Sequence, residues 1–132
     1  MESNGMTLLS NIRLQGALRE DDFEAVSVFK PGDIAISGEE ILRRGKELGA
    51  VGGEDHGLLL VGWKENLLGR LGGGRKVIFP DTVYQDPNGK QWVPCAWLHD
   101  LDGWALALRS IDGSFDESYI FLRRRTATGV AV

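Results

Sequence analysis

The clearest alternation of apolar and polar positions lies in the C-terminal part of the chain. Three apolar runs, residues 90–98, 104–111 and 118–122, are separated by loops at residues 99–103 and 112–117 that are rich in Asp and Gly. Short runs of strand-forming residues joined by loops of this kind are typical of β-hairpins. The pattern therefore predicts a three-strand antiparallel meander.

The strongest helix signal precedes the meander, at residues 37–48. Ser37 is followed three residues later by Glu40, which fits a capping box, and Ile41, Leu42 and Leu48 then form an apolar stripe. In such a box the hydroxyl accepts a hydrogen bond from a free backbone amide and the carboxylate reaches back to the capping residue. Because the following residue is a glycine, a frequent helix stop, we expect the helix to end there.

Two other segments are ambiguous. Residues 7–18 fit a helix or a strand, because their apolar positions follow neither period cleanly. Residues 55–71 fit either one helix or a strand followed by a helix. We favour the second interpretation, because Gly57 and Gly62 would each weaken a continuous helix by about 1 kcal/mol relative to Ala.

The remaining signals are short extended segments and turns. Strands are predicted at residues 23–29, 34–36, 76–79 and 82–85, with Pro/Gly and Asp/Asn turns at residues 30–33 and 86–89. A chain of 132 residues without a visible linker fits a single domain, residues 1–132, of which we expect residues 1–6 to be disordered. The predicted fold class is α+β: an antiparallel β-sheet containing the C-terminal three-strand meander, packed with two or three N-terminal helices.

The two faces of the meander are both apolar. Strand alternation places Trp92 and Pro94 on one face of residues 90–98 and Cys95 and Trp97 on the other, and neither face is cleanly polar. Such a sheet needs cover on both sides. Helices can cover one face. The other face can be covered by N-terminal strands, a bound ligand or a second copy of the chain. Pro94 has no amide to donate, which predicts an edge strand or a bulge.

Composition and charge narrow the class of partner. The formal net charge is −4 and the sequence pI is about 5.1, so a mildly acidic chain repels nucleic acid and anionic membranes at long range. We expect neither as a partner. One cysteine excludes an internal disulfide and fits a reducing compartment. The chain has no secretory signal pattern at its start and no apolar run long enough to span a bilayer, which predicts a cytoplasmic protein.

No metal or cofactor site is predicted. The acidic loops at residues 99–103 and 112–117 do not match the spacing of a calcium loop, and Asp and Gly are what turns require. The glycines at residues 69–74 follow a predicted helix, whereas a phosphate loop runs from a strand into a helix. We interpret these segments as connections.

One pair of residues suggests catalysis. The stretches at residues 30–34 and 55–62 resemble the start of circularly permuted papain-like hydrolases, in which a histidine precedes the cysteine in the chain. The resemblance implies a Cys95–His56 pair, because an imidazole lowers the pKa of a thiol and keeps a thiolate ready for attack. The family's cysteine opens a helix, whereas Cys95 follows Pro94 within a predicted strand.

The tryptophans suggest binding instead. Four Trp residues are many for this length, and they are placed at Trp63, Trp92, Trp97 and Trp104. Such side chains suit apolar pockets and interfaces. The favoured hypothesis is a non-catalytic homodimeric protein that presents a Trp-bearing sheet face to a small apolar or aromatic ligand or to a second subunit. The alternatives are the cysteine-dependent hydrolase and a structural subunit of a larger assembly.

Overall fold

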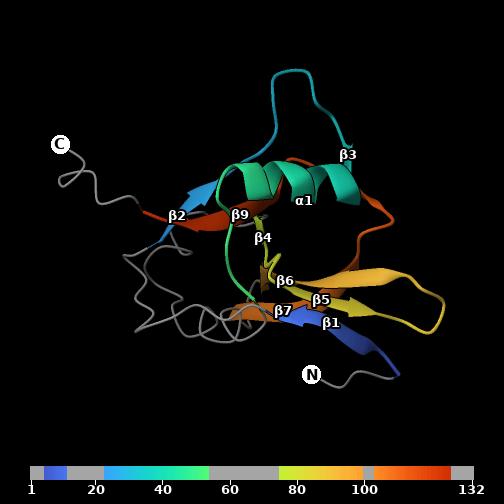
Figure 1. The fold of residues 1–132 in the computed structure, drawn as a ribbon. Helices are drawn as coiled ribbons and strands as arrows, with labels where there is room; N and C mark the ends of the chain where they lie inside the picture. The colour runs from blue at the N-terminus through green and yellow to red at the C-terminus, as the bar shows by residue number, and fades with distance from the viewer. Residues whose placement is uncertain (1–4, 12–22, 54–74, 100–102, 126–132) are drawn as a thin grey trace.

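A computed structural model describes residues 5–11, 23–53, 75–99 and 103–125 (Figure 1). The elements in chain order are β1 (Thr7–Asn11), β2 (Phe23–Val26), β3 (Ile36–Ser37), α1 (Gly38–Glu47), β4 (Lys76–Ile78), β5 (Thr82–Gln85), β6 (Gln91–His99), β7 (Gly103–Ser110), β8 (Ser114–Phe115) and β9 (Tyr119–Arg124). Seven strands form one sheet, and β3 pairs with β8 in a small second sheet. In the described part of the chain no helix is long and apolar enough to cross a membrane.

The predicted antiparallel sheet with two or three helices is wrong. The described residues hold a single helix and a curled mixed sheet that includes one parallel pair. Residues 7–11, part of the segment that fitted either a helix or a strand, form strand β1, which pairs antiparallel with β5. Because its apolar positions follow neither period cleanly, tertiary pairing decided the outcome there. Residues 12–18, residues 55–71 and the first part of the segment expected to be disordered lie outside the described residues.

Strand β6 organises the sheet. One edge of β6 pairs with β7 along its length, so the hairpin at residues 90–111 is confirmed. The other edge pairs first with β5 and then with β4, in two different registers. Pro94 lies at this break, where its carbonyl oxygen accepts a hydrogen bond from the Phe79 amide at 3.0 Å. A central strand therefore tolerates proline, because the neighbouring chain bulges away where an amide partner would be needed.

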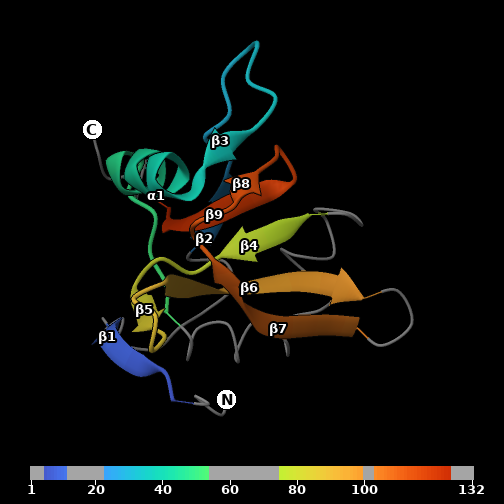
Figure 2. The same ribbon diagram turned by 90° about the vertical axis from the view of Figure 1, so that its right-hand side faces the viewer.

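The third strand of the predicted meander lies elsewhere. Strand β9 does not pair with β7; it runs parallel to β4, with Val77 opposite Ile120, and antiparallel to β2, with Ala25 opposite Leu122. Figure 2 shows β4 between β6 and β9. The first four residues of β9 are all buried, and a position beside β7 at the sheet edge would leave them partly exposed. The free energy gained by burying both faces of β9 thus favoured this position over pairing with β7, the preceding long strand in the chain.

Apolar side chains are buried on both faces of the sheet, in agreement with the alternation in the sequence. The face that carries α1 holds a cluster that includes Ile41 of the helix, Cys95 and Phe121. On the opposite face Val77 and Ala96 are fully buried. The β6 strand is therefore sandwiched, as its two apolar faces require.

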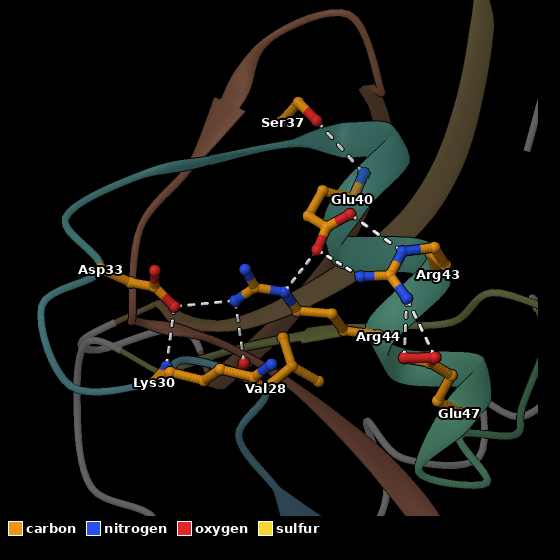
Figure 3. A network of polar contacts seen from close by, with 8 residues as sticks. All are labelled: Val28, Lys30, Asp33, Ser37, Glu40, Arg43, Arg44 and Glu47. Carbon is orange, nitrogen blue, oxygen red and sulfur yellow. Dashed lines mark hydrogen bonds and ion pairs between the residues drawn. The ribbon is translucent and has the colours of Figure 1, made fainter.

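Helix α1 begins as the capping pattern predicts. The Ser37 hydroxyl accepts a hydrogen bond from the Glu40 amide at 3.2 Å. The Glu40 carboxylate does not reach back to Ser37; it accepts hydrogen bonds from Arg43 and Arg44 (Figure 3). Half of the capping box is thus replaced by an ion network.

Replacing Ser37 by Ala is expected to lower the free energy of unfolding by about 1 kcal/mol, because the Glu40 amide loses its acceptor. Urea unfolding followed by tryptophan fluorescence measures the change. Ser37→Asp is the matched control, because its carboxylate supplies an acceptor at the same place. A Ser37→Ala protein as stable as the natural one would show that this hydrogen bond contributes nothing.

The ion network attaches the loop before β3 to the helix (Figure 3). Arg44 lies between two carboxylates: its Nη1 is 2.7 Å from Asp33 Oδ2, and its Nε is 2.7 Å from Glu40 Oε2. Arg44 Nη1 also donates to the Val28 carbonyl at 3.3 Å. One arginine therefore joins two parts of the connection between β2 and β3, at Val28 and Asp33, to the helix.

This network predicts acid sensitivity. Hydrogen bonds from Arg43 and Arg44 lower the pKa of Glu40 from 4.5 to about 2, and the Lys30 amide and Arg44 lower the pKa of Asp33. Carboxylates with depressed pKa values stabilise the fold above their unfolded values, and that contribution is lost as the pH falls from about 4.5 toward 2. We expect urea midpoints to fall over this range, and to fall less in Glu40→Gln. Equal pH slopes in the two proteins would contradict the assignment.

Candidate functional site

A pocket of about 260 Å³ opens on the sheet face that carries Cys95. It is lined by Lys76, Cys95, Trp97, Ala107, Leu108, Arg109 and Tyr119, from β4, β6, β7 and β9. The strand registers explain why most of these residues meet. Lys76 lies opposite both Trp97 and Tyr119, and Cys95 lies opposite Ala107. Directly opposite residues share a face of the sheet, so four strands contribute neighbouring side chains.

Lys76 is positioned over an aromatic ring. Its Nζ lies 4.9 Å from the centroid of the Tyr119 ring and 3.4 Å from Ser118 Oγ. An ammonium group at this distance is attracted by the face of the ring. The side chain of Lys76 runs from β4 toward β9, and its ammonium group lies at the wall of the pocket.

Arg109 is held more firmly. Its guanidinium carbon lies 4.5 Å from the centroid of the Phe115 ring and 5.0 Å from that of Tyr119. Its Nη2 donates to the Ser114 carbonyl at 2.7 Å. Its Nε is buried and has no hydrogen-bond partner in the described part of the chain. Such orphaned donors are rare in folded proteins and call for an explanation.

The Asp116 carboxylate, which interacts electrostatically with both cations, is already engaged in hydrogen bonds. The Asp116 side chain accepts hydrogen bonds from the Ser118 amide, at 2.9 Å, and from the Ser118 hydroxyl. These bonds are the main reason that the pKa of Asp116 is lowered, with smaller contributions from Lys76 and Arg109. Within the described ranges neither cation forms an ion pair with a carboxylate, so this part of the surface carries two unpaired positive charges.

Cys95 is a neutral thiol in this position. The residue is 4% exposed, and burial raises the pKa of the thiol to about 12, although Arg109 and Lys76 act to lower it. A cysteine nucleophile needs a thiolate near neutral pH. The other member of the suggested pair, His56, lies outside the described residues. A protonated thiol within a strand argues against the hydrolase alternative.

The two tryptophans whose side chains are described, Trp92 and Trp97, lie on opposite faces of β6. Trp97 lines the pocket beside Cys95. Trp92 lies on the opposite face, where its Nε1 donates to Asp86 Oδ2 at 3.1 Å and so anchors the turn before β6. The backbone of Trp104 lies in β7, opposite Leu98, but its side chain is outside the described set. Trp63 is outside the described residues altogether.

Five of the seven lining residues were not predicted as site residues, and three of these, Lys76, Arg109 and Tyr119, carry polar or aromatic groups. Arg109 could have been found, because it is the one charged residue within the apolar run at residues 104–111. A single charge on an apolar strand face requires a specific partner. Lys76 and Tyr119 gave no such signal, because each begins its strand and looks like an ordinary strand end.

Comparisons with protein-family models, curated proteins and solved structures found no match. In the described part of the chain, no three His, Cys, Asp or Glu side chains gather closely enough to hold a metal ion. The pocket combines two cations, two aromatic rings and a neutral thiol.

Proposed function

We propose that this protein is a non-catalytic binding protein that takes a small aromatic ligand into the pocket beside Trp97. The observation that carries this proposal is a concave site of about 260 Å³ in which the Trp97 and Tyr119 side chains and the Cys95 thiol line one cavity. Small-molecule sites are typically concave, mostly apolar and supplied with a few polar groups. The volume fits a ligand with one or two rings. The free, buried thiol also supports a reducing location such as the cytoplasm.

The test is calorimetric titration of the full chain with indole, phenol and their charged derivatives. We expect saturable binding of at least one compound. Trp97→Leu should weaken that binding at least tenfold, because the ring that forms the wall is lost. Trp92→Phe is the matched control, since Trp92 lies on the opposite face, and should bind as the natural protein does. If no compound binds, or if the two variants bind alike, the pocket is not the ligand site.

We also propose that the protein forms a homodimer through the outer edge of β7. The Ile111 amide donates to the Gln91 carbonyl at 3.0 Å, so this residue faces β6. Because amide direction alternates along a strand, the amides of Leu106 and Leu108 point to the other edge. No strand among the described residues pairs with that edge.

The composition of β7 favours a second copy of the same strand. Its eight residues include no Lys, Pro, Asp or Glu, which natural edge strands use to prevent pairing. Leu106 and Leu108 are partly exposed. Two antiparallel copies of one strand pair about a two-fold axis and satisfy each other's amides, which is the symmetry of most homodimers.

Sedimentation equilibrium tests this dimer. We expect the natural protein to sediment as a dimer and Leu106→Pro to sediment as a folded monomer, because proline removes an outward amide and leaves the hydrogen bonds to β6 intact. Leu106→Ala keeps the amide and is the control for the lost side chain. A monomeric natural protein, or a dimeric Leu106→Pro protein, would rule out this interface.

A further inference from the structure

Both charged residues among the described residues that line the pocket are cations, and no carboxylate of the described part of the chain lines it. The protein as a whole carries a net charge of −4, so two neighbouring positive charges that form no ion pair in the described part of the chain run against its composition. Maintaining cations beside a buried apolar floor costs solvation free energy. A ligand that brings a negative charge would offset this cost.

Arg109 lacks one acceptor. Two aromatic rings and the Ser114 carbonyl hold its guanidinium group in place, yet its buried Nε donates to no group in the described part of the chain. A guanidinium group has five donors in a fixed plane and binds carboxylates with high geometric specificity. Because Arg109 lines the pocket, an anion bound there would accept hydrogen bonds from this guanidinium group.

Lys76 faces the same space from the other side. Its ammonium group has three donors, and the contact with Ser118 Oγ at 3.4 Å is long. The lysine and the arginine both lie against the Tyr119 ring, at 4.9 Å and 5.0 Å. One small anion beside Tyr119 could therefore interact with both.

We infer that the ligand of this pocket is a small aromatic carboxylate, with its carboxylate bound by Arg109 and Lys76 and its ring against Trp97. This inference rests on the proposed binding function and adds the charge of the ligand to it. The size of the pocket favours such a compound over a larger anion, because sites for drug-sized ligands begin at roughly 300 Å³.

The test compares two probes of nearly equal size, indole-3-acetate and indole-3-acetamide, by calorimetry at low salt. We expect the acid to bind at least tenfold more tightly than the amide. Lys76→Met, which keeps the apolar stem, should remove most of this preference, and Arg109→Lys should reduce it because the planar donor set is lost. Lys90→Met changes an exposed lysine in the turn before β6 and should leave the preference unchanged.

The outcomes separate this inference from the proposed function. Equal binding of the acid and the amide would overturn the anionic ligand and leave the aromatic pocket in place. Binding of neither probe, nor of any neutral aromatic compound, would overturn both. A preference for the acid that survives in the Lys76→Met/Arg109→Met double variant, which removes both charges, would show that these cations are not its source. Near-UV circular dichroism confirms that each variant is folded.

Discussion

Replacing Gly38 by Ala is expected to lower the free energy of unfolding by about 3 kcal/mol or more, although alanine is the better helix former. A Cβ atom at this position would lie 2.0 Å from the Ile111 carbonyl oxygen and 2.7 Å from the Ile111 Cα. Both are backbone atoms, so no side-chain rotation relieves the overlap. The start of α1 would have to move from the β7–β8 connection, which also weakens the hydrogen bond from the Gly38 amide to the Gly113 carbonyl at 3.3 Å.

The gain in helix propensity, about 1 kcal/mol, is smaller than this steric cost. Urea unfolding followed by fluorescence measures the difference. Lys46→Ala is the matched control, because Lys46 is exposed on the same helix and its replacement should change stability by no more than about 0.5 kcal/mol. A Gly38→Ala protein that is more stable than the natural one would mean that helix and connection are not in close contact.

Replacing Phe121 by Ala is expected to lower the free energy of unfolding by about 3–5 kcal/mol. This side chain is fully buried in the cluster between α1 and the sheet. Phe121 and Tyr119 are on the same face of β9. The residue that packs against α1 and the residue that lines the pocket therefore belong to one continuous surface of the strand. We therefore expect the same variant to weaken ligand binding as well as stability.

The partner of Phe121 across the interface is Gly45. A Cβ atom at Gly45 would lie 2.7 Å from Phe121 Cζ and 2.9 Å from each of its Cε atoms. Gly45→Ala alone should destabilise the protein by about 1–3 kcal/mol through overpacking. In the Phe121→Ala background the added methyl group enters the cavity, so the cost should shrink or change sign, with a coupling of about 0.5–3 kcal/mol. Strictly additive effects of the two changes would contradict direct packing between these residues.

Local signals in the sequence predicted local structure correctly. The turn at residues 86–89 forms, with Gly89 at φ 85° and the Asp86 side chain accepting from the Asn88 and Lys90 amides at 2.9 Å. The cap at Ser37 and the hairpin of β6 and β7 are also present. Each depends on residues close in the chain, whose backbone preferences and side-chain hydrogen bonds act in any tertiary context.

Placement of the strands depended on distant residues. Strand β9 lies between β4 and β2, and not beside β7, because this position buries Tyr119–Leu122. The sequence of these four residues does not indicate which strands they pair with. Alternation along β6 correctly placed Trp92 and Trp97 on opposite faces. Lys76 and Tyr119 lie near Trp97 only because β4 pairs with β6 on one side and with β9 on the other.

The sequence by itself thus determined the capped helix, the turns, the hairpin and the need to bury both faces of β6. Only the tertiary structure decided the single-helix mixed sheet and the pocket with its two cations. The physical reason is that strand order and register come from the total burial and hydrogen bonding of the whole sheet. Those energies depend on contacts between segments far apart in the chain, so they cannot be predicted from the sequence of any one segment.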